Sequence, residues 1–311
     1  MAKILILTDG KAGHENQSKA FARALGGEFE LVKVQFKSKF HKALSYLYDN
    51  IGILTTSLFS PMQEPSDDIR AVIGTGSGTF YAVKVLAKKL GVKGAVVLYP
   101  RGYKISNFDC ILAPVFDQPT PAKNVIAIPA NLVANDEAFY DKAVGEFKQR
   151  IGDKRHDGKE SDIIAVIIGG PNKCSTMSEE WIRNELDRIM AENPNAVKWV
   201  TTSRRTPAEV EKAVSEYKWD YELLYSKDHF NPIPAFVKLA SKIYVTAEST
   251  GMISEACTFG SAEVHALDNL MPGNHKFRRF VVSLGENGYV NGNRKIDLAD
   301  EFSRARRLME V

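Results

Sequence analysis

Residues 3–17, KILILTDGKAGHENQ, decide how the first half of the chain folds. The apolar run Lys3 to Thr8 predicts a short buried strand. After a glycine-containing loop, the segment Asn16 to Leu25 has the pattern of a helix, which Gly26 and Gly27 close. A strand, a loop and a helix in this order are typical of a parallel sheet covered by helices.

The same alternation continues through the first half of the chain. Thr79 to Leu90 reads as a second helix. Further strands are predicted at Phe29–Phe36, Ala71–Thr75, Ala95–Tyr99, Asp109–Ala113 and Val125–Ile128. These elements together predict one doubly wound α/β unit.

Residues 148–161, KQRIGDKRHDGKES, are almost entirely charged or polar and resemble an interdomain linker. The alternation then restarts, with strands predicted at Asp162–Ile168, Val197–Thr202, Tyr221–Tyr225, Lys242–Thr246 and Glu263–Leu267. Asp297–Met309 predicts a terminal amphipathic helix. We therefore predict two domains, residues 1–155 and 156–311, with packing of the terminal helix back on the N-terminal domain as an alternative.

The composition argues against several classes of protein. With 41 basic and 38 acidic side chains the formal net charge is only +3, so nothing indicates a nucleic-acid binder. Cys110, Cys174 and Cys257 are far apart and odd in number, which argues against a disulfide framework or a cysteine zinc site. No run of about 18 apolar residues predicts a membrane-spanning helix, and no signal-peptide core is visible. We expect a cytoplasmic location, and peripheral contact with the inner face of a membrane is compatible with it.

Three loops of the second half follow predicted strands, and ligands of open parallel sheets bind beyond the carboxyl ends of strands. The first loop contains paired glycines, which let a ligand approach the backbone, and a lysine that supplies positive charge. A tight turn that needs glycine explains the same pattern. The candidate residues are Gly169, Gly170, Asn172 and Lys173.

The second loop carries two adjacent arginines. Thr206, Pro207 and Glu209 have the spacing of a capping box, which places both arginines just before a helix N-terminus. Two guanidinium groups there repel the positive end of the helix dipole unless an anion such as a diphosphate binds them. The alternative is that one arginine pairs with a carboxylate of the other domain. The candidate residues are Thr202, Ser203, Arg204 and Arg205.

The third loop leads into a helix that begins near Gly251. Its backbone amides and hydroxyls suit phosphate oxygens. Glu255 falls about one turn into the helix, where its carboxylate could accept both hydroxyls of a ribose. A favourable interaction with the helix N-terminus is the alternative. The candidate residues are Glu248, Ser249, Thr250, Gly251, Met252 and Glu255.

Two loops of the first half carry the remaining candidates. The catalytic candidates Asp9, His14 and Glu15 follow the first strand, where a histidine or a carboxylate could remove a proton from an acceptor hydroxyl. His14 at a helix N-terminus can equally lack a chemical role. The loop after Ala71–Thr75 lacks the third glycine of a dinucleotide fingerprint, because Thr79 stands there. The acceptor-side candidates are Lys11, Gly13, Gly76 and Ser77.

The segment Lys37 to Pro61 mixes basic residues with many aromatic and aliphatic ones. Such an amphipathic stretch suits a membrane surface or a lipid-linked acceptor. Packing of one helix face against the core explains the same pattern and is the favoured interpretation.

Four segments together resemble a known family. They are ILTDGKAGHENQS at 6–18, IGGPNK at 168–173, TTSRRTP at 201–207 and TAESTGMISEA at 246–256, and they look like the signatures of the Elm-type mitochondrial-fission family. That family is similar to the GT-B glycosyltransferases, in particular the inverting enzyme that completes the lipid-linked peptidoglycan precursor. The resemblance covers almost the whole chain and implies two doubly wound, Rossmann-like domains that face a central cleft.

The resemblance also implies roles for individual residues. A histidine near the acceptor falls on His14, and a diphosphate contact falls on Arg204 or Arg205. The donor contacts that it implies are Ser249, Gly251 and the ribose-binding Glu255. The chain departs from the glycosyltransferases at residues 9–11, where Asp-Gly-Lys stands in place of a longer glycine run.

The leading hypothesis is a metal-independent inverting glycosyltransferase that uses a nucleotide-diphosphate sugar as substrate and needs no cofactor. His14 or Asp9 would deprotonate the acceptor, and a lipid-linked acceptor is one candidate. The lack of an Asp-x-Asp triplet agrees with a reaction that uses no metal. Two alternatives remain open, namely a nucleotide-sugar epimerase of the same fold and a non-catalytic adaptor, since plant members of the family are implicated in recruiting a dynamin-type protein.

Overall fold

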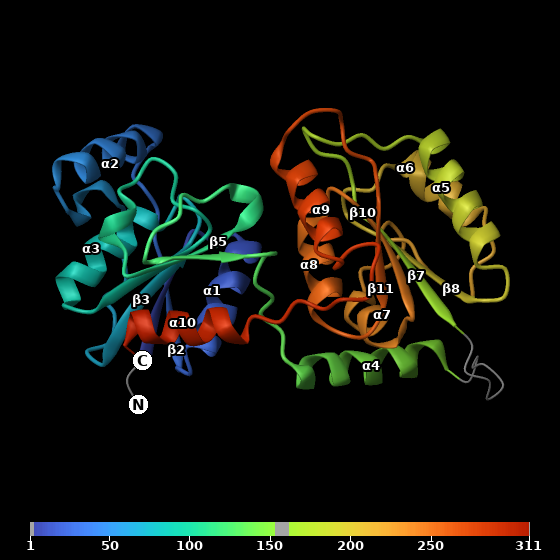
Figure 1. Ribbon diagram of the computed structural model, residues 1–311, viewed down its shortest axis with the longest axis horizontal. Coiled ribbons are helices and arrows are strands. Elements are labelled where there is room, and N and C mark those ends of the chain that lie inside the picture. Colours follow the sequence, from blue (N-terminus) through green and yellow to red (C-terminus); the bar gives the residue numbers. More distant parts are fainter. Residues whose placement is uncertain (1–2, 153–161, 311) are drawn as a thin grey trace. The chain divides into compact units, whose positions relative to one another are not determined.

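A computed structural model describes residues 3–152 and 162–310 (Figure 1). The chain forms two compact units. The first combines Met1–Ala134 with Leu298–Val311, and the second consists of Asn135–Asp297. Each unit is built on its own sheet of parallel strands.

The limits of the units differ from the predicted boundary at residue 155. Helix α4 (Glu137–Ile151) belongs to the second unit, and the terminal helix α10 (Ala299–Met309) belongs to the first. The predicted linker is therefore wrong for residues 148–151, which are helical because Tyr140 and Phe147 give α4 a buried face. The rest of that segment, residues 153–161, lies outside the described residues.

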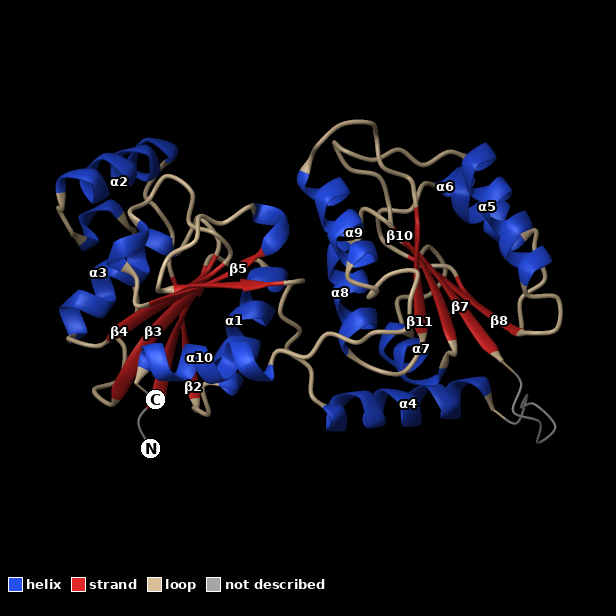
Figure 2. Ribbon diagram, in the orientation of Figure 1, coloured by secondary structure: helices blue, strands red, loops and turns tan. Residues whose placement is uncertain are grey.

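The sheet of the first unit has six strands in the order β2-β1-β3-β4-β5-β6. Figure 2 draws its strands in red and the helices around them in blue. The strands are β1 (Lys3–Thr8), β2 (Phe29–Lys33), β3 (Ile69–Thr75), β4 (Lys93–Val97), β5 (Cys110–Pro114) and β6 (Val125–Ile128). Besides α10, its helices are α1 (Ala12–Ala24), α2 (Lys39–Ile51) and α3 (Phe80–Leu90), with short 3-10 helices at Thr56–Leu58, Ile105–Asn107 and Val115–Asp117. Every strand predicted in this half is confirmed, with ends that differ by up to three residues.

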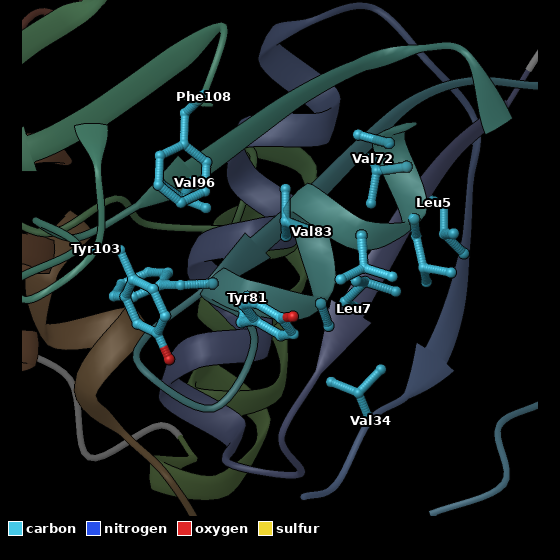
Figure 3. Close-up of a cluster of buried hydrophobic side chains, with 14 of the residues drawn as sticks. Leu5, Leu7, Val34, Val72, Tyr81, Val83, Val96, Tyr103 and Phe108 are labelled. Atoms are coloured by element: carbon cyan, nitrogen blue, oxygen red, sulfur yellow. The ribbon is translucent and has the colours of Figure 1, made fainter. Parts of the chain in front are cut away.

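Strand β1 shows why the apolar runs form this sheet. Its side chains alternate between two buried faces, so both must be apolar. Leu5 and Leu7 join the cluster under α3, which includes Tyr81 and Val83 (Figure 3). On the opposite face, the cluster around α1 and α10 takes Ile4 and Ile6 of β1 together with Phe21, Ala305 and Met309.

The second sheet has five parallel strands in the order β11-β10-β7-β8-β9. They are β7 (Ile163–Ile168), β8 (Val197–Thr202), β9 (Tyr221–Leu223), β10 (Lys242–Thr246) and β11 (Glu263–Leu267). Besides α4, its helices are α5 (Glu179–Glu192), α6 (Ala208–Ser215), α7 (Ile233–Leu239), α8 (Thr250–Thr258) and α9 (Lys276–Glu286). One face packs against α5 and α6, while Phe147 of α4 and Phe236 of α7 contact Trp199 on the other.

Both sheets reverse their direction of growth at one point. In the first, the chain passes from β1 to β2 on one side and then to β3 on the other, so the reversal lies between β1 and β3. In the second it lies between β7 and β10. At such a switch point the loops beyond the carboxyl ends of the strands diverge and leave a crevice where ligands bind.

Helix α2 confirms the core-packing interpretation of the basic and aromatic segment and also exposes apolar side chains. Its inner face packs on the core through Leu44, Tyr46 and Tyr48. Its outer face leaves Phe40 and Leu47 70% and 54% exposed. Among the residues that the structure describes, no helix combines the length and the apolar character needed to cross a bilayer.

Candidate functional site

Hydrogen bonds join the loops at the switch point of the second sheet. The amide of Gly169 donates to Thr246 Oγ1 at 2.9 Å, and the amide of Gly170 donates to Glu248 Oε1 at 2.8 Å. Glu248 Oε2 accepts from Asn269 Nδ2 at 2.7 Å. The loops after β7, β10 and β11 are therefore one hydrogen-bonded unit, which we call the loop frame.

The loop frame changes the interpretation of three predicted ligand contacts. The amides of Gly169 and Gly170 are used within the protein, and Glu248 is only 3% exposed, with partners on both carboxylate oxygens. A Cβ on Gly169 would overlap Glu248 Oε1. These three residues position the loops, and the glycines are explained by close packing of protein atoms.

The loop after β8 joins the same frame. A Cβ on Gly170 would overlap the backbone carbonyl of Arg205. The Thr206 hydroxyl donates to the carbonyl of Gly169 and accepts from the amide of Ser203 at 2.8 Å. Helix α6 has Pro207 as its N-cap and no side-chain cap, so the predicted capping box is wrong, because the Thr206 hydroxyl is directed to β7 instead.

Cationic side chains lie on the loops of the frame. Arg204, Arg205 and Lys173 are exposed, and within residues 3–152 and 162–310 none of the three forms an ion pair. Asn172 uses its side-chain oxygen to accept from the amide of Cys174 at 2.8 Å. The loop after β8 therefore offers two adjacent guanidinium groups to an anion from solution.

Helix α8 begins at this edge of the sheet, with Ser249 as N-cap and no side-chain cap hydrogen bond. Its first turn contains Thr250, Gly251 and Met252, of which Gly251 is exposed. The first amides of a helix have no acceptor inside it, and the helix dipole is positive there. The edge of the sheet thus combines the start of a helix with exposed arginines on a second loop.

Glu255 lies in the second turn of α8 and accepts a hydrogen bond from the Tyr140 hydroxyl of α4 at 3.0 Å. Burial raises the pKa of the Glu255 carboxyl, and the hydrogen bond from Tyr140 opposes that shift in part. Burial and the nearby carboxyl raise the pKa of the Tyr140 hydroxyl, which keeps it a donor. Because Tyr140 contacts Oε1, a ribose hydroxyl would have to use Oε2.

The sequence interpretation did not include the loop after β9 among its candidate loops. The predicted strand ran to Tyr225, but β9 ends at Leu223, so Tyr225 lies in the loop and stacks on His229 with ring centroids 4.5 Å apart. An aromatic residue just beyond the end of a strand was the feature of the sequence that could have drawn attention to this loop. The predicted contact Thr202 is buried, and its hydroxyl accepts from the Tyr225 amide at 2.7 Å and contacts Glu211.

At the switch point of the first sheet, Asp9 and His14 form a hydrogen-bonded pair. His14 Nδ1 lies 3.1 Å from both carboxylate oxygens of Asp9. Burial opposes ionisation of Asp9, but hydrogen bonds from Lys11 and His14 outweigh it, so the pKa of Asp9 is lowered. A carboxylate held at Nδ1 orients the imidazole and leaves Nε2 available for proton transfer.

The loop after β3 provides the space for this pair. Gly76 has φ of +82°, and a Cβ there would lie 2.6 Å from His14 Nδ1. A Cβ on Gly78 would lie 2.8 Å from the Asp9 Cβ. The glycines that first suggest a dinucleotide fingerprint therefore make room for Asp9 and His14.

The other candidate residues of the first unit differ in their contacts. Lys11 pairs with Asp9 at 3.0 Å, which places it at the pair. Glu15 pairs with Lys19 at 2.7 Å and so faces along α1. Ser77 accepts from Lys42 Nζ at 2.8 Å. Gly13 has open space around its Cα, so nothing in the structure requires glycine there.

The fold is that of the GT-B proteins, as solved structures show. The UDP-GlcNAc 2-epimerase from Neisseria meningitidis, bound to UDP-GlcNAc, aligns with a TM-score of 0.51 and 11% identity over 99% of this chain and 98% of that chain. MnaA of S. aureus with UDP gives 0.50 and 14% over 97% and 94%, and the UDP-GlcNAc 2-epimerase from Methanocaldococcus jannaschii with UDP-GlcNAc and UDP gives 0.50 and 12% over 100% and 99%. At these identities the likeness shows the fold alone.

The sequence places the chain more narrowly within this class. It belongs to the mitochondrial fission ELM1 family, whose model matches residues 12–306. Among curated proteins, none matches this sequence.

Proposed function

We propose that the chain binds a nucleotide-diphosphate sugar in its second unit and transfers the sugar as a metal-independent inverting glycosyltransferase. One observation carries the proposal. The loops after β7, β10 and β11 are hydrogen-bonded to one another, and the loop after β8 packs against them with Arg204 and Arg205 exposed and, among the described residues, in no ion pair. Proteins of the same fold are solved with UDP and UDP-GlcNAc, which agrees with a nucleotide sugar as ligand.

The frame suits a diphosphate because it brings cationic side chains and the start of α8 to one edge of the sheet. Guanidinium groups and helix amides stabilise negative charge where it develops as the bond from the sugar to the diphosphate breaks. Glu255 would accept a ribose hydroxyl through Oε2, while Tyr140 keeps the carboxyl in place. The frame thus stabilises the leaving group, and Glu255 selects for a nucleoside.

The acceptor reaction requires a base, and the Asp9–His14 pair supplies one. Nε2 of His14 removes the proton from an acceptor hydroxyl while its oxygen forms a bond to the anomeric carbon. The bond from that carbon to the diphosphate oxygen breaks in the same step, and the diphosphate leaves with the electron pair. Asp9 stabilises the imidazolium that results.

Calorimetric titration with UDP and with pyrophosphate tests the nucleotide site. Replacing Arg204 and Arg205 together by alanine should weaken both ligands at least about tenfold, because charge-assisted hydrogen bonds are each worth about 1.5–3 kcal/mol. Glu255→Ala should weaken UDP but not pyrophosphate. Arg188→Ala, which removes an arginine paired with Glu185 and Glu192 on α5, is the matched control and should change neither.

Two outcomes would point to other functions. Equal UDP affinity in the wild type and the arginine double variant would remove both arginines from the site. If no nucleoside diphosphate binds the wild type, a non-catalytic adaptor becomes the better interpretation. Epimerisation is separated by its product, since it yields the nucleotide sugar inverted at one carbon and no glycosylated acceptor.

A further inference from the structure

Helix α2 and the residue after its C-cap expose an apolar stripe, which we call the α2 stripe. Phe40, Leu47 and Ile51 are 70%, 54% and 60% exposed, and Ile53 beyond the C-cap is 43% exposed. Ala43 is exposed between the first two. Spacings of three and four residues place these side chains on one side of the helix. Large apolar side chains gathered on one exposed face mark an interaction surface.

The opposite face of α2 is fixed to the first unit, so the stripe is not the result of a loosely attached helix. Asp49 is fully buried, pairs with Lys84 Nζ at 2.6 Å and accepts from the amide of Lys104 at 2.6 Å. The Ser45 hydroxyl is 2.7 Å from the Tyr103 hydroxyl. The helix therefore holds its apolar stripe outward in a defined orientation.

The charged residues that neighbour the α2 stripe in the sequence are mainly basic. Lys37 and Lys39 are exposed at the start of α2, and Lys33 is exposed at the end of β2. From Lys33 to Gln63 the single carboxylate in the sequence is Asp49, which is buried against Lys84. An exposed apolar face that follows exposed lysines, in a segment whose one carboxylate is buried, is complementary to a surface that is apolar inside and anionic outside.

We propose that the α2 stripe docks the first unit on an anionic lipid surface. Phe40, Leu47 and Ile51 would enter the boundary between headgroups and acyl chains, and the lysines would contact anionic headgroups. A second copy of the chain is a poorer fit, because a two-fold contact over this face would bring the lysines of both copies together.

The position of α2 gives this docking a consequence for the acceptor. Lys42, on the inner side of α2, donates to Ser77 in the β3 loop, and Gly76 of that loop packs against His14. A lipid-linked hydroxyl at the same surface would therefore meet the loops that carry Asp9 and His14. This consequence rests on the proposed function, whereas the docking itself does not.

Flotation with vesicles of phosphatidylcholine, with and without phosphatidylglycerol, tests the docking. The wild type should bind the anionic vesicles and bind less as salt rises. Phe40→Gln, Leu47→Gln and Ile51→Gln combined should lower the affinity at least about tenfold. Lys37→Glu with Lys39→Glu should also lower it about tenfold or more, since each basic residue near such a surface contributes about 1 kcal/mol.

Val282→Gln is the matched control, because it removes an apolar side chain that is 47% exposed on α9 of the other unit. It should bind vesicles like the wild type. The proposal is overturned if the wild type does not bind anionic vesicles, or if both sets of α2 variants bind them unchanged. A dimer in light scattering that the triple variant abolishes would assign the stripe to a second copy and also overturn it. UDP titration of the same variants reports separately on the nucleotide site.

Discussion

The two switch points use glycine and carboxylates in opposite ways. In the second unit, Gly170 lets the backbone of one loop lie against another, and the result is a frame of hydrogen bonds. In the first unit, Gly76 leaves space for the His14 ring. Hydrogen bonds from Lys11 and His14 lower the pKa of Asp9, whereas burial raises that of Glu255. At one edge the glycine allows backbone segments to pack, and at the other it makes room for a hydrogen-bonded carboxylate and imidazole.

The largest effect should come from breaking the loop frame. Gly170→Val would place a side chain on the Arg205 carbonyl, and backbone cannot move aside as a flexible side chain can. We expect the free energy of unfolding to fall by more than about 4 kcal/mol, which denaturant unfolding would measure. Gly145→Ala, in α4 with open space at its Cβ, is the control and should stabilise the protein by up to about 1 kcal/mol. A Gly170→Val variant as stable as the wild type would disprove the frame.

Crowding the Asp9–His14 pair should affect the proposed reaction rate more than stability. Gly76→Ala displaces the His14 ring, and Asp9→Asn removes the charge that orients it. In sugar-transfer assays each should lower kcat by about 10²-fold or more, with the donor KM nearly unchanged, because both residues belong to the first unit and the proposed nucleotide site to the second. Gly91→Ala has a similar left-handed backbone (φ +69°) and no neighbour within 4 Å, so it controls for backbone strain. Equal kcat in all three variants would exclude the pair.

The smallest effect concerns the buried carboxyl. Because its pKa is raised from 4.5, Glu255 stabilises the fold relatively at low pH, and this contribution is lost as pH rises through the raised value. Glu255→Gln keeps an acceptor for Tyr140 without a charge. It should therefore melt higher than the wild type at pH 8, by about 2–4 °C for each kcal/mol gained, and equally at pH 4. A lower melting temperature at pH 8 would show that the charge is stabilised in the fold.

Local pattern was sufficient to predict the sheets. The predicted runs at β1, β6, β8, β10 and β11 match the observed strands at both ends. Strands that are buried on both faces, such as β1, need continuous apolar sequence. The β8 loop arginines and the first turn of α8 also lie where the sequence indicated. Each depends only on the residues beside it.

Contacts between segments that are far apart in the chain could not be predicted from the sequence. Nothing near Glu248 shows that Asn269 would bind it, and nothing near Thr206 shows that its hydroxyl would turn to Gly169 instead of capping α6. The polar segment at 148–151 continues α4 because Phe147, just before it, packs against Phe236. These features follow from how the strands are ordered, which one sequence does not state.

Asp49 on the inner face of α2 forms a buried ion pair with Lys84 of α3. This pair places the two faces of α2 under different evolutionary constraints. Losing either Asp49 or Lys84 alone would leave an isolated charge in the core at a cost of about 3–5 kcal/mol, whereas an apolar exchange of both can be neutral. Homologues should therefore change positions 49 and 84 together or keep both. Phe40 and Ile51 on the outer face can drift among apolar residues one at a time.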